Sequence, residues 1–249
     1  MSERQSTVRF DNVSKAFGKI KILENASFEI DEGKALVILG RSGTGKSVTL
    51  KMMIGLLKPD QGEIFIHGKE ITALDSGELS AVRKEMGFLF QNAALFDSIS
   101  VGENVAFPLR RHGKFPEEEI RQRASQRLAQ VSLKDVYDKM PSDLSGGMKK
   151  RAAMARALAL DPSVLLVDEP SAGLDPITSA EIDKLLIDLK ADHKTTLVVV
   201  THNIPSARRI GDEIIVLDNG NIIARGSWGD LEASDNEIVQ QFLHSEGGG

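Results

Sequence analysis

Cysteine is absent from this sequence, which excludes disulfide bonds and thiolate metal sites and is typical of a reducing compartment. No apolar run approaches the roughly 18 residues of a membrane-spanning helix, and the first ten residues lack the apolar core of a signal peptide. An excess of positive charge is also missing, since 31 Lys and Arg residues face 36 Asp and Glu residues. The resulting net charge of -5 disfavours nucleic acid as a partner. We expect a soluble, cytoplasmic protein that reaches a membrane only through a partner.

Several segments have the pattern of antiparallel strands. The chain has 249 residues, of which 41% are hydrophobic, and this is enough to bury a sizeable core. Residues 7–31 predict short strands broken by a turn at 17–19, and residues 62–71 predict a further hairpin. Another hairpin, with its turn at Asn219-Gly220, is indicated near the end of the chain.

Three other segments are continuous runs rich in Val, Leu and Ile, at residues 35–40, 163–168 and 195–202. Such runs are typical of strands covered on both faces, as in a parallel sheet flanked by helices. Residues 92–160 have helical periodicity and charge clusters, which predicts a helical insertion between the first two runs. The sequence therefore predicts an α/β protein.

Polar or small residues close all three apolar runs. Gly40 ends the first run, Asp168 and Glu169 end the second, and His202 ends the third. In an open parallel sheet the carboxyl ends of the strands share one edge, and ligands bind at that edge. Three separate segments therefore indicate one common site.

The octapeptide GRSGTGKS at residues 40–47 matches the phosphate-binding loop pattern, and it follows a buried strand and precedes a helical segment. Its glycines let backbone N–H groups surround phosphate oxygens at the start of the helix. Lys46 would neutralise the β and γ phosphates, and the Ser47 hydroxyl would hold Mg²⁺. The alternative is a glycine-rich turn that binds nothing. The expected nucleotide contacts are Gly40, Arg41, Ser42, Gly43, Thr44, Gly45, Lys46, Ser47 and Val48.

Two adjacent carboxylates follow the second apolar run. Asp168 would be a buried carboxylate without a partner unless a cation met it, and the Mg²⁺ of a nucleotide is the natural one. Glu169 would point to the other side of the chain, toward an attacking water, and is our candidate general base. The alternative for each carboxylate alone is the capping of a loop.

Two neutral polar residues are expected at the same edge. His202 alone would fit a core histidine, but at this edge it could donate to a γ-phosphate or hold the water and Glu169 in register. Gln91 follows the apolar GFLF, and its amide could reach Mg²⁺ or the water. The alternative for Gln91 is a solvated loop residue.

Residues 143–150, DLSGGMKK, place Ser145 and two glycines before a run of strong helix formers. Gly146 and Gly147 would let another backbone approach closely, and Ser145 with the free N–H groups of the coming helix would form a second anion site. Because one nucleotide already has its phosphate loop, we expect this site to close over a nucleotide held by a second copy of the chain. The alternative is an ordinary helix start that Ser145 caps.

These motifs, in this order, resemble those of the ATPase subunits of ABC (ATP-binding cassette) transporters over residues 7–227. They are Walker A at 40–47, the Q-loop at Gln91, the signature LSGGM at 144–148, Walker B at 164–169, the D-loop SAGLD at 171–175 and the switch histidine His202. The resemblance implies that two subunits enclose two ATP molecules with Mg²⁺, each between one Walker A loop and the opposite signature. It also implies that Phe17 stacks on the adenine and that Asp175 belongs to the nucleotide site.

The same resemblance implies a P-loop NTPase fold. Its parts are a RecA-like parallel core sheet with helices on both faces, an antiparallel β subdomain and an inserted helical subdomain that carries the signature. We expect a single domain over 1–249, with the core at 7–91 and 161–227, the helical subdomain at 92–160 and a C-terminal extension at 228–249.

The signature has Met148 where LSGGQ, its commonest form, has glutamine. Together with residues 90–110 and 168–179, Met148 makes the chain similar to the ATPases of Mla-type lipid transport systems. This similarity implies phospholipid transport between the bacterial inner and outer membranes. It further implies a permease in the membrane, a periplasmic MCE-domain protein and a small STAS-domain protein as partners. The subunit would lie on the cytoplasmic face of the inner membrane.

The segment after Gln91 is apolar and could form part of a groove for a short permease helix, as the resemblance implies. Its residues could instead pack within the helical insertion. They are Ala93, Ala94, Leu95, Phe96, Ile99 and Val101.

Other functions remain open at this point. The chain could serve another ABC system, such as a solute importer or a lipoprotein-type exporter. A chromosome or repair ATPase of this type would need a long coiled coil, which the sequence lacks, and a translation-associated cassette would usually carry the motifs twice. A GTPase or phosphotransferase would leave LSGGM and His202 unexplained.

Overall fold

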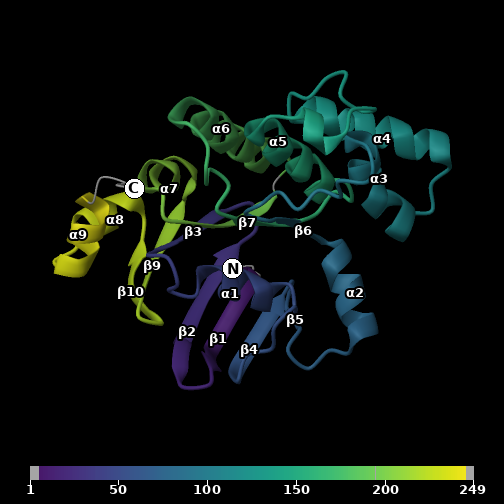
Figure 1. The fold of residues 1–249 in the computed structure, drawn as a ribbon. Coiled ribbons are helices and arrows are strands. Elements are labelled where there is room, and N and C mark those ends of the chain that lie inside the picture. The colour runs from purple at the N-terminus through teal and green to yellow at the C-terminus, as the bar shows by residue number, and fades with distance from the viewer. Residues whose placement is uncertain (1–5, 194, 245–249) are drawn as a thin grey trace.

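The computed structural model describes residues 6–193 and 195–244, which form two sheets with helices around them (Figure 1). The strands are β1 (Ser6–Phe17), β2 (Ile20–Asp31), β3 (Ala35–Gly40), β4 (Gln61–Ile66), β5 (Lys69–Glu70), β6 (Met86–Leu89), β7 (Val164–Asp168), β8 (Thr196–Thr201), β9 (Glu213–Asp218) and β10 (Asn221–Gly226). The helices are α1 (Lys46–Met53), α2 (Ser76–Lys84), α3 (Val101–His112), α4 (Glu117–Gln130), the 3-10 turn η1 (Pro141–Asp143), α5 (Gly146–Ala157), α6 (Pro176–His193), α7 (Ile204–Ile210), α8 (Trp228–Glu232) and α9 (Glu237–His244).

The smaller sheet is antiparallel, with the strand order β2-β1-β4-β5. The turn between β1 and β2 falls at the expected place, but each strand has 12 residues, so the expectation of short strands was wrong. Shifts of register near Asn12, which has a φ of 49°, let the long pair continue. A bulge absorbs local irregularity without ending a strand, and no residue pattern in β1 or β2 predicted it.

The larger sheet has the order β10-β9-β3-β8-β7-β6. The three apolar runs form β3, β7 and β8, which pair in parallel and are buried at every position. The short strand β6, which the sequence pattern did not reveal, adds a further parallel partner to β7. The expected hairpin at Asn219-Gly220 joins β9 to β10, and β9 pairs in parallel with β3.

Alternate residues of β3 serve two hydrophobic cores. Leu36 and Ile38 pack with α1 and the antiparallel sheet, whereas Ala35, Val37 and Leu39 pack on the opposite face with α5, α6 and α7. Figure 1 shows this layering, with the antiparallel sheet below the larger sheet and α5 and α6 above it. A strand between two apolar layers needs apolar residues at every position, which explains the unbroken runs.

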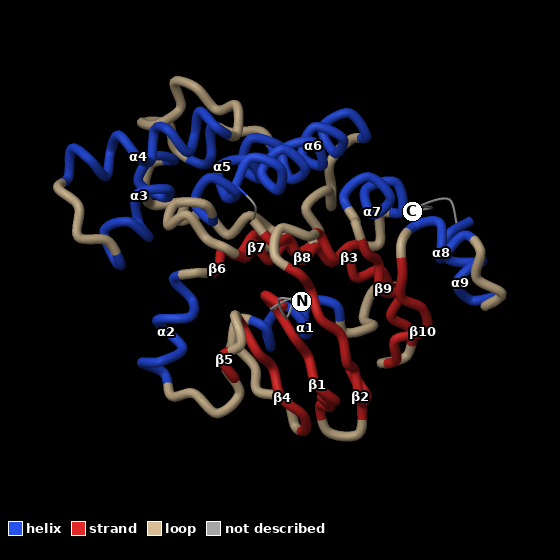
Figure 2. The backbone as a smooth tube through the Cα atoms, turned by 180° about the vertical axis from the view of Figure 1, so that it is seen from behind, coloured by secondary structure: helices blue, strands red, loops and turns tan. Residues whose placement is uncertain are grey.

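The helical layer contains α3, α4 and α5, which lie within the expected insertion, and Figure 2 shows them together on one side of the larger sheet. The exact limits of the subdomains stay a prediction. Near the chain end, Leu231, Val239 and Leu243 join the core under α7, so α8 and α9 pack on this chain. The final glycines lie outside the described residues. None of the described helices is both long and apolar enough to cross a membrane.

Candidate active site

The carboxyl ends of β3, β6, β7 and β8 bring the expected polar residues to one edge of the larger sheet, as the strand order requires. A cleft of about 260 Å³ opens there. Its lining residues are Ile22, Ser42, Gly43, Gly45, Lys46, Ser47, Val48, Gln91, Glu169 and His202. Segments that are distant in the sequence therefore meet in a single hollow, and most of them were expected to do so.

The phosphate loop leads directly into α1, and the first turn of this helix has no side-chain cap. The preceding residue, Gly45, has a φ of 98°, and a Cβ atom there would lie 2.6 Å from the carbonyl oxygen of Ile22. Only glycine satisfies both conditions. The uncapped N–H groups at this helix start, together with the loop, are well suited to hold phosphate oxygens.

Lys46 is buried at the base of the cleft and donates hydrogen bonds to the carbonyl oxygens of Gly40 (2.8 Å) and Arg41 (3.1 Å). The ammonium is therefore held inside the loop that precedes it. A lysine in this position presents a fixed positive charge to an anion bound by the loop.

Asp168 is buried beside α1, and the Ser47 hydroxyl donates a hydrogen bond to its Oδ1 atom at 2.8 Å. Burial raises the pKa of Asp168, although the hydrogen bond from Ser47 opposes this shift. A cation would remove that cost of burial. A hydroxyl, a carboxylate and the amide of Gln91 are oxygen donors of the kind that Mg²⁺ prefers, so the residues fit the expected ion.

The same donor set is too small to hold a metal ion alone. Within residues 6–193 and 195–244, no group of three or more His, Cys, Asp or Glu side chains is arranged to bind one. The remaining ligands of a Mg²⁺ ion here would therefore be phosphate oxygens and water, which is typical of nucleotide-dependent Mg²⁺ sites.

Glu169 has a left-handed backbone, with a φ of 46°, and its carboxylate turns away from Asp168 into the cleft. One carboxylate oxygen lies 3.4 Å from Lys46 Nζ, and the other lies 3.0 Å from His202 Nδ1. The backbone N–H of His202 also donates to this carboxylate, at 3.3 Å. The strained conformation thus places a buried carboxylate between a lysine and an imidazole, as a general base would require.

His202 is at the mouth of the cleft, and its side chain is 56% exposed. The alternative of a core histidine is therefore wrong. Gln91 is also exposed and lines the cleft, where its amide faces the same hollow as Glu169. Their catalytic roles stay predictions.

The signature lies outside this cleft. Ser145 and Gly146 are exposed, and the Ser145 hydroxyl accepts a hydrogen bond from the Met148 N–H at 3.3 Å, so the capping alternative is present in the structure. A Cβ on Gly147 would lie 2.6 Å from Thr178, whereas a Cβ on Gly146 would meet only Leu174, at 3.7 Å. Gly147 is thus needed for packing inside the chain, and Gly146 is not.

Two other expected contacts also lie outside the cleft. Asp175 caps α6, because its carboxylate accepts hydrogen bonds from the N–H groups of Ile177 and Thr178, both at 3.0 Å. Phe17 ends β1 at the turn into β2, and it is 47% exposed. Neither residue lines the cleft, and their contact with a nucleotide stays a prediction.

The residues that line the groove after Gln91 are not all those that the sequence analysis considered. Val101 and Ala93 are buried in the core, so for these two the packing alternative is right. A hollow of about 350 Å³ does lie beside this segment, and exposed aromatic rings rim it. Its lining residues are Arg83, Met86, Gly87, Phe88, Phe90, Ala94, Phe96, Phe107, Pro108, His112, Arg156, Ala157 and Leu160.

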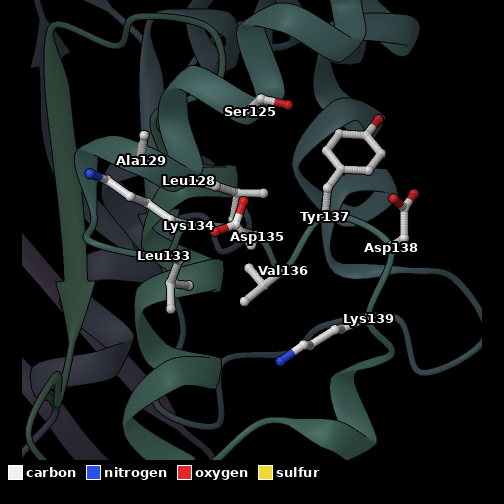
Figure 3. A pocket seen from close by; sticks show the side chains of 10 residues that line it. All are labelled: Ser125, Leu128, Ala129, Leu133, Lys134, Asp135, Val136, Tyr137, Asp138 and Lys139. Carbon is white, nitrogen blue, oxygen red and sulfur yellow. The ribbon is translucent and has the colours of Figure 1, made fainter.

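Another hollow, of about 710 Å³, is larger than the cleft and is lined by residues between 125 and 139, just before the signature. Figure 3 shows that side chains from α4 and the following loop line it, with Tyr137 and Leu128 beside charged residues such as Lys134 and Asp138. None of the expected site residues lies among them. Size alone would therefore have chosen the wrong place for the chemistry.

Sequence reasoning missed Ile22 and Lys150. Ile22 lies at the start of β2 and lines the cleft through its contact with the phosphate loop. Lys150 is a buried residue of α5, and its ammonium group donates hydrogen bonds to the backbone carbonyl groups of Gln91 and Glu169. Ile22 has no motif around it, and Lys150, although it ends the stretch DLSGGMKK, lies in a helix of basic residues, where a lysine is normally expected to be exposed.

Comparisons with known proteins agree with this geometry. A family model described as ABC transporter matches residues 23–172. The chain is 43% identical over 238 residues to a probable ribonucleotide transport ATP-binding protein from Mycobacterium bovis; the match covers 96% of this chain but only 66% of that protein. It is 41% identical to an intermembrane phospholipid transport system ATP-binding protein from Haemophilus influenzae, over 98% of this chain and 93% of that protein.

A solved structure is similar in its fold as well. It is a dimeric ATP-binding cassette in a post-hydrolysis state with bound ADP and Pi, and it superposes with a TM-score of 0.82 at 37% identity, over 88% of this chain and 98% of that chain. The expected P-loop NTPase fold is therefore confirmed.

Proposed function

This chain belongs to the ABC transporter family as an ATP-binding cassette, and from that premise we propose that it hydrolyses MgATP to energise a transporter. The observation that carries the proposal is the cleft in which Lys46, Ser47, Gln91, Glu169 and His202 meet. Four segments supply these five groups, and each group matches one task of phosphoryl transfer to water.

The phosphate loop and Lys46 would hold the triphosphate. Lys46 donates hydrogen bonds to carbonyl groups of its own loop, so its charge is positioned before a nucleotide binds. Ser47 and Asp168 would hold Mg²⁺ with the help of Gln91. That ion supplies positive charge against the phosphate oxygens when it is bound.

Glu169 would accept the proton of the attacking water. Its carboxylate is buried and lies 3.0 Å from His202 Nδ1, so the imidazole orients it and can contact the γ-phosphate side of the cleft. Lys46 Nζ lies 3.4 Å from the other carboxylate oxygen. The carboxylate is therefore held between Lys46 and His202 before a water is bound.

We infer that the working form is a pair of identical subunits. Three residues at the starts of α5 and α6 are exposed, and none of them lines the cleft of its own chain. They are Ser145, Gly146 and Asp175. Ile177, two residues after Asp175, is 76% exposed, and a second copy that meets Asp175 would cover it. The dimeric cassette to which the chain is similar supports this arrangement.

The groove beside β6 is the proposed seat of a permease helix. Phe90, Phe96 and Phe107 are exposed at its rim, and the rings of Phe96 and Phe107 lie 5.1 Å apart. An apolar helix end that projects from a membrane protein would cover these rings. Since Phe90 and Gln91 are adjacent, movement at the groove would reach the nucleotide cleft directly.

The cargo we propose is phospholipid, moved between the inner and outer membranes of a bacterium. The similarity to the Haemophilus phospholipid transport subunit over nearly both full lengths supports this choice. The partners would be a permease, a periplasmic MCE-domain protein and a small STAS-domain protein, with this subunit on the cytoplasmic face of the inner membrane. A ribonucleotide transporter is the second candidate, because the mycobacterial relative carries that name.

The test is to isolate the tagged chain from its native membranes and to identify the membrane proteins that accompany it. We expect a permease and an MCE-domain protein, and the ATPase activity of the complex should respond to phospholipid and not to ribonucleotides. A complex that lacks any integral membrane protein would contradict the transporter proposal, and stimulation by ribonucleotides alone would favour the second candidate.

A matched pair of variants tests the groove. Phe96→Asp should release the permease, since a carboxylate cannot be buried against an apolar helix. Ile238→Asp is the control, because Ile238 has nearly the same exposed fraction, 45% against 46%, on a distant helix. Equal retention of the permease by both variants would argue against the groove.

A further inference from the structure

Lys150 is a buried cation to which the proposed reaction gives no task. It lies in the second turn of α5 and is only 5% exposed. Its ammonium group donates hydrogen bonds to two backbone oxygens, that of Gln91 and that of Glu169, the latter at 3.2 Å. Gln91 comes after β6 and Glu169 comes after β7. One side chain therefore joins the signature helix to two strand ends that carry site residues.

Burial of the Lys150 ammonium group costs free energy of desolvation, so we expect the group to have a function that offsets this cost. Desolvation lowers the pKa of Lys150, and the nearby carboxylates of Asp168 and Glu169 oppose that shift. The hydrogen bonds of the ammonium go to main-chain oxygens, so they fix the backbone and leave the carboxylates free. A residue needed only for packing would be apolar at such a position.

The backbone that Lys150 holds at Glu169 is the strained one. A non-glycine residue keeps a φ of 46° only when its surroundings hold it there. The Glu169 N–H donates to Val200 O at 2.9 Å, and the Glu169 carbonyl accepts from the Ala172 N–H at 3.2 Å as well as from Lys150. The peptide groups on both sides of Glu169 are thus fixed, and this fixes where its carboxylate points.

A second cation of α5 holds the chain just after Gln91. Arg156 donates to the carbonyl oxygens of Ala93 (2.9 Å) and Ala94 (2.6 Å), and both alanines have left-handed backbones, with φ values of 59° and 50°. We call Lys150 and Arg156 the carbonyl clamp. Because of the clamp, the loop that contains Gln91 cannot shift independently of α5.

We propose that Lys150 is a positioning residue for ATP hydrolysis: it ties the backbone of Gln91 and Glu169 to α5, so that both side chains follow this helix as one unit. The inference rests on the proposed function. Ser145 caps the start of α5, and we expect it to meet the nucleotide of the second copy. Contact at that helix end would therefore be transmitted to the general base through the Lys150 side chain.

The experiment compares variants of the full chain with the wild type. Lys150→Met removes the ammonium group but keeps an unbranched side chain of similar length. We expect kcat to fall about 10- to 100-fold while the KM for ATP stays within about twofold, because a misplaced base affects the chemical step and not nucleotide binding. Lys150→Arg keeps a cation with several donors and should recover most of the activity.

The matched control is Lys149→Met. Lys149 is the preceding residue of the same helix, is half-buried, and has no side-chain hydrogen bond or ion pair with any residue that the structure describes. We expect its kcat and KM to equal those of the wild type. An equal loss in both lysine variants would show an effect on the helix and would overturn the proposal.

A double variant separates positioning from a general structural role. If Lys150 acts through Glu169, then Lys150→Met should reduce the residual single-turnover rate of Glu169→Gln by less than about twofold. The same 10- to 100-fold loss in both backgrounds, an order-of-magnitude range for independent effects, would overturn the proposal.

Lys150→Gln keeps the experiment decisive if the methionine variant does not fold. Glutamine retains a donor without the charge, so we expect a folded protein with an intermediate loss in kcat. Wild-type kcat in Lys150→Gln would refute the positioning role. A wild-type chain that does not hydrolyse ATP at all would refute the proposed function instead, so the two failures are distinct.

Discussion

The two helices that begin after glycine-containing motifs, α1 and α5, differ in how the chain completes their first turns. α1 has no side-chain cap, and its start opens into a cleft that four strand ends surround. α5 is capped by its own Ser145, and its start is exposed away from that cleft. The start of α1 therefore faces site residues of its own chain, whereas the start of α5 faces none among the residues that the structure describes.

This difference indicates that glycine is present in the two motifs for different reasons. At Gly45 the requirement is internal, because a positive φ and the carbonyl of Ile22 both exclude a side chain. At Gly146 no residue that the structure describes requires glycine. Since no contact among the described residues explains a glycine at position 146, close approach of a second copy is the best explanation. This is the physical argument for the proposed dimer.

The largest expected effect concerns the cleft at the start of α1. Glu169→Gln should leave ATP binding intact and reduce hydrolysis by about 10²- to 10⁴-fold, because an amide cannot accept the proton of the attacking water. The ATP-bound dimer should then persist. Steady-state hydrolysis and size-exclusion chromatography with ATP measure the two results.

The control for this variant is Glu237→Gln, which makes the same chemical change on an exposed residue of α9. It should hydrolyse ATP at the wild-type rate. Wild-type turnover in Glu169→Gln would show that another group is the base, and His202 would be the next residue to test.

The cleft at the start of α1 is also the part of the structure that was predicted best from the sequence. The buried strands and the phosphate loop have local signatures, since a run such as residues 35–40 is apolar at each position and the loop has fixed spacing. The convergence of Gly40, Asp168 and His202 followed from the rule for parallel sheets. No knowledge of side-chain packing was needed.

Other features depend on tertiary packing and could not be predicted in this way. The strand β6 has only four residues, too few for a pattern to distinguish a strand from a loop. For Val101 both a groove and core packing were open, and it is buried, while Lys150 is a buried cation in a basic segment. Burial of single residues on a helix is decided by neighbours that are distant in sequence.

The next prediction tests whether the exposed end is completed by a second copy. Lys46→Ala and Ser145→Arg should each abolish activity alone, the first by damage to the phosphate loop and the second by obstruction of the signature. A 1:1 mixture should recover up to about a quarter of the wild-type activity, since half of randomly formed dimers contain one intact composite site out of two. No recovery at any ratio, with mixed dimers shown to form, would contradict the shared site.

A smaller effect distinguishes the two signature glycines. Gly147→Ala should lower the free energy of unfolding by about 1–3 kcal/mol, because its Cβ would lie 2.6 Å from Thr178. Thr178 cannot easily turn away, since its hydroxyl donates to Asp175 at 2.6 Å. Denaturant unfolding measures this loss.

Gly146→Ala should give the opposite result. Its Cβ would make only an ordinary contact with Leu174 at 3.7 Å, so stability should be unchanged or slightly higher. Turnover should nevertheless fall about tenfold, because the methyl group faces the surface that must approach a nucleotide closely. Full activity in Gly146→Ala would remove the main physical support for an external partner at this helix end.

The smallest effect is expected for Met148→Gln, which restores the commoner signature. The Met148 side chain is partly buried against the core of the helical layer, and its contribution to the helix start is the backbone N–H that Ser145 caps. The backbone is unchanged in the variant, so turnover should stay within about threefold of the wild type, while the loss of apolar contact lowers stability by about 1 kcal/mol. Steady-state kinetics and thermal unfolding measure these changes. If the activity were lost completely, position 148 would have to contact the nucleotide of the second copy through its side chain, and the exposed helix end would depend on more than backbone donors and Ser145.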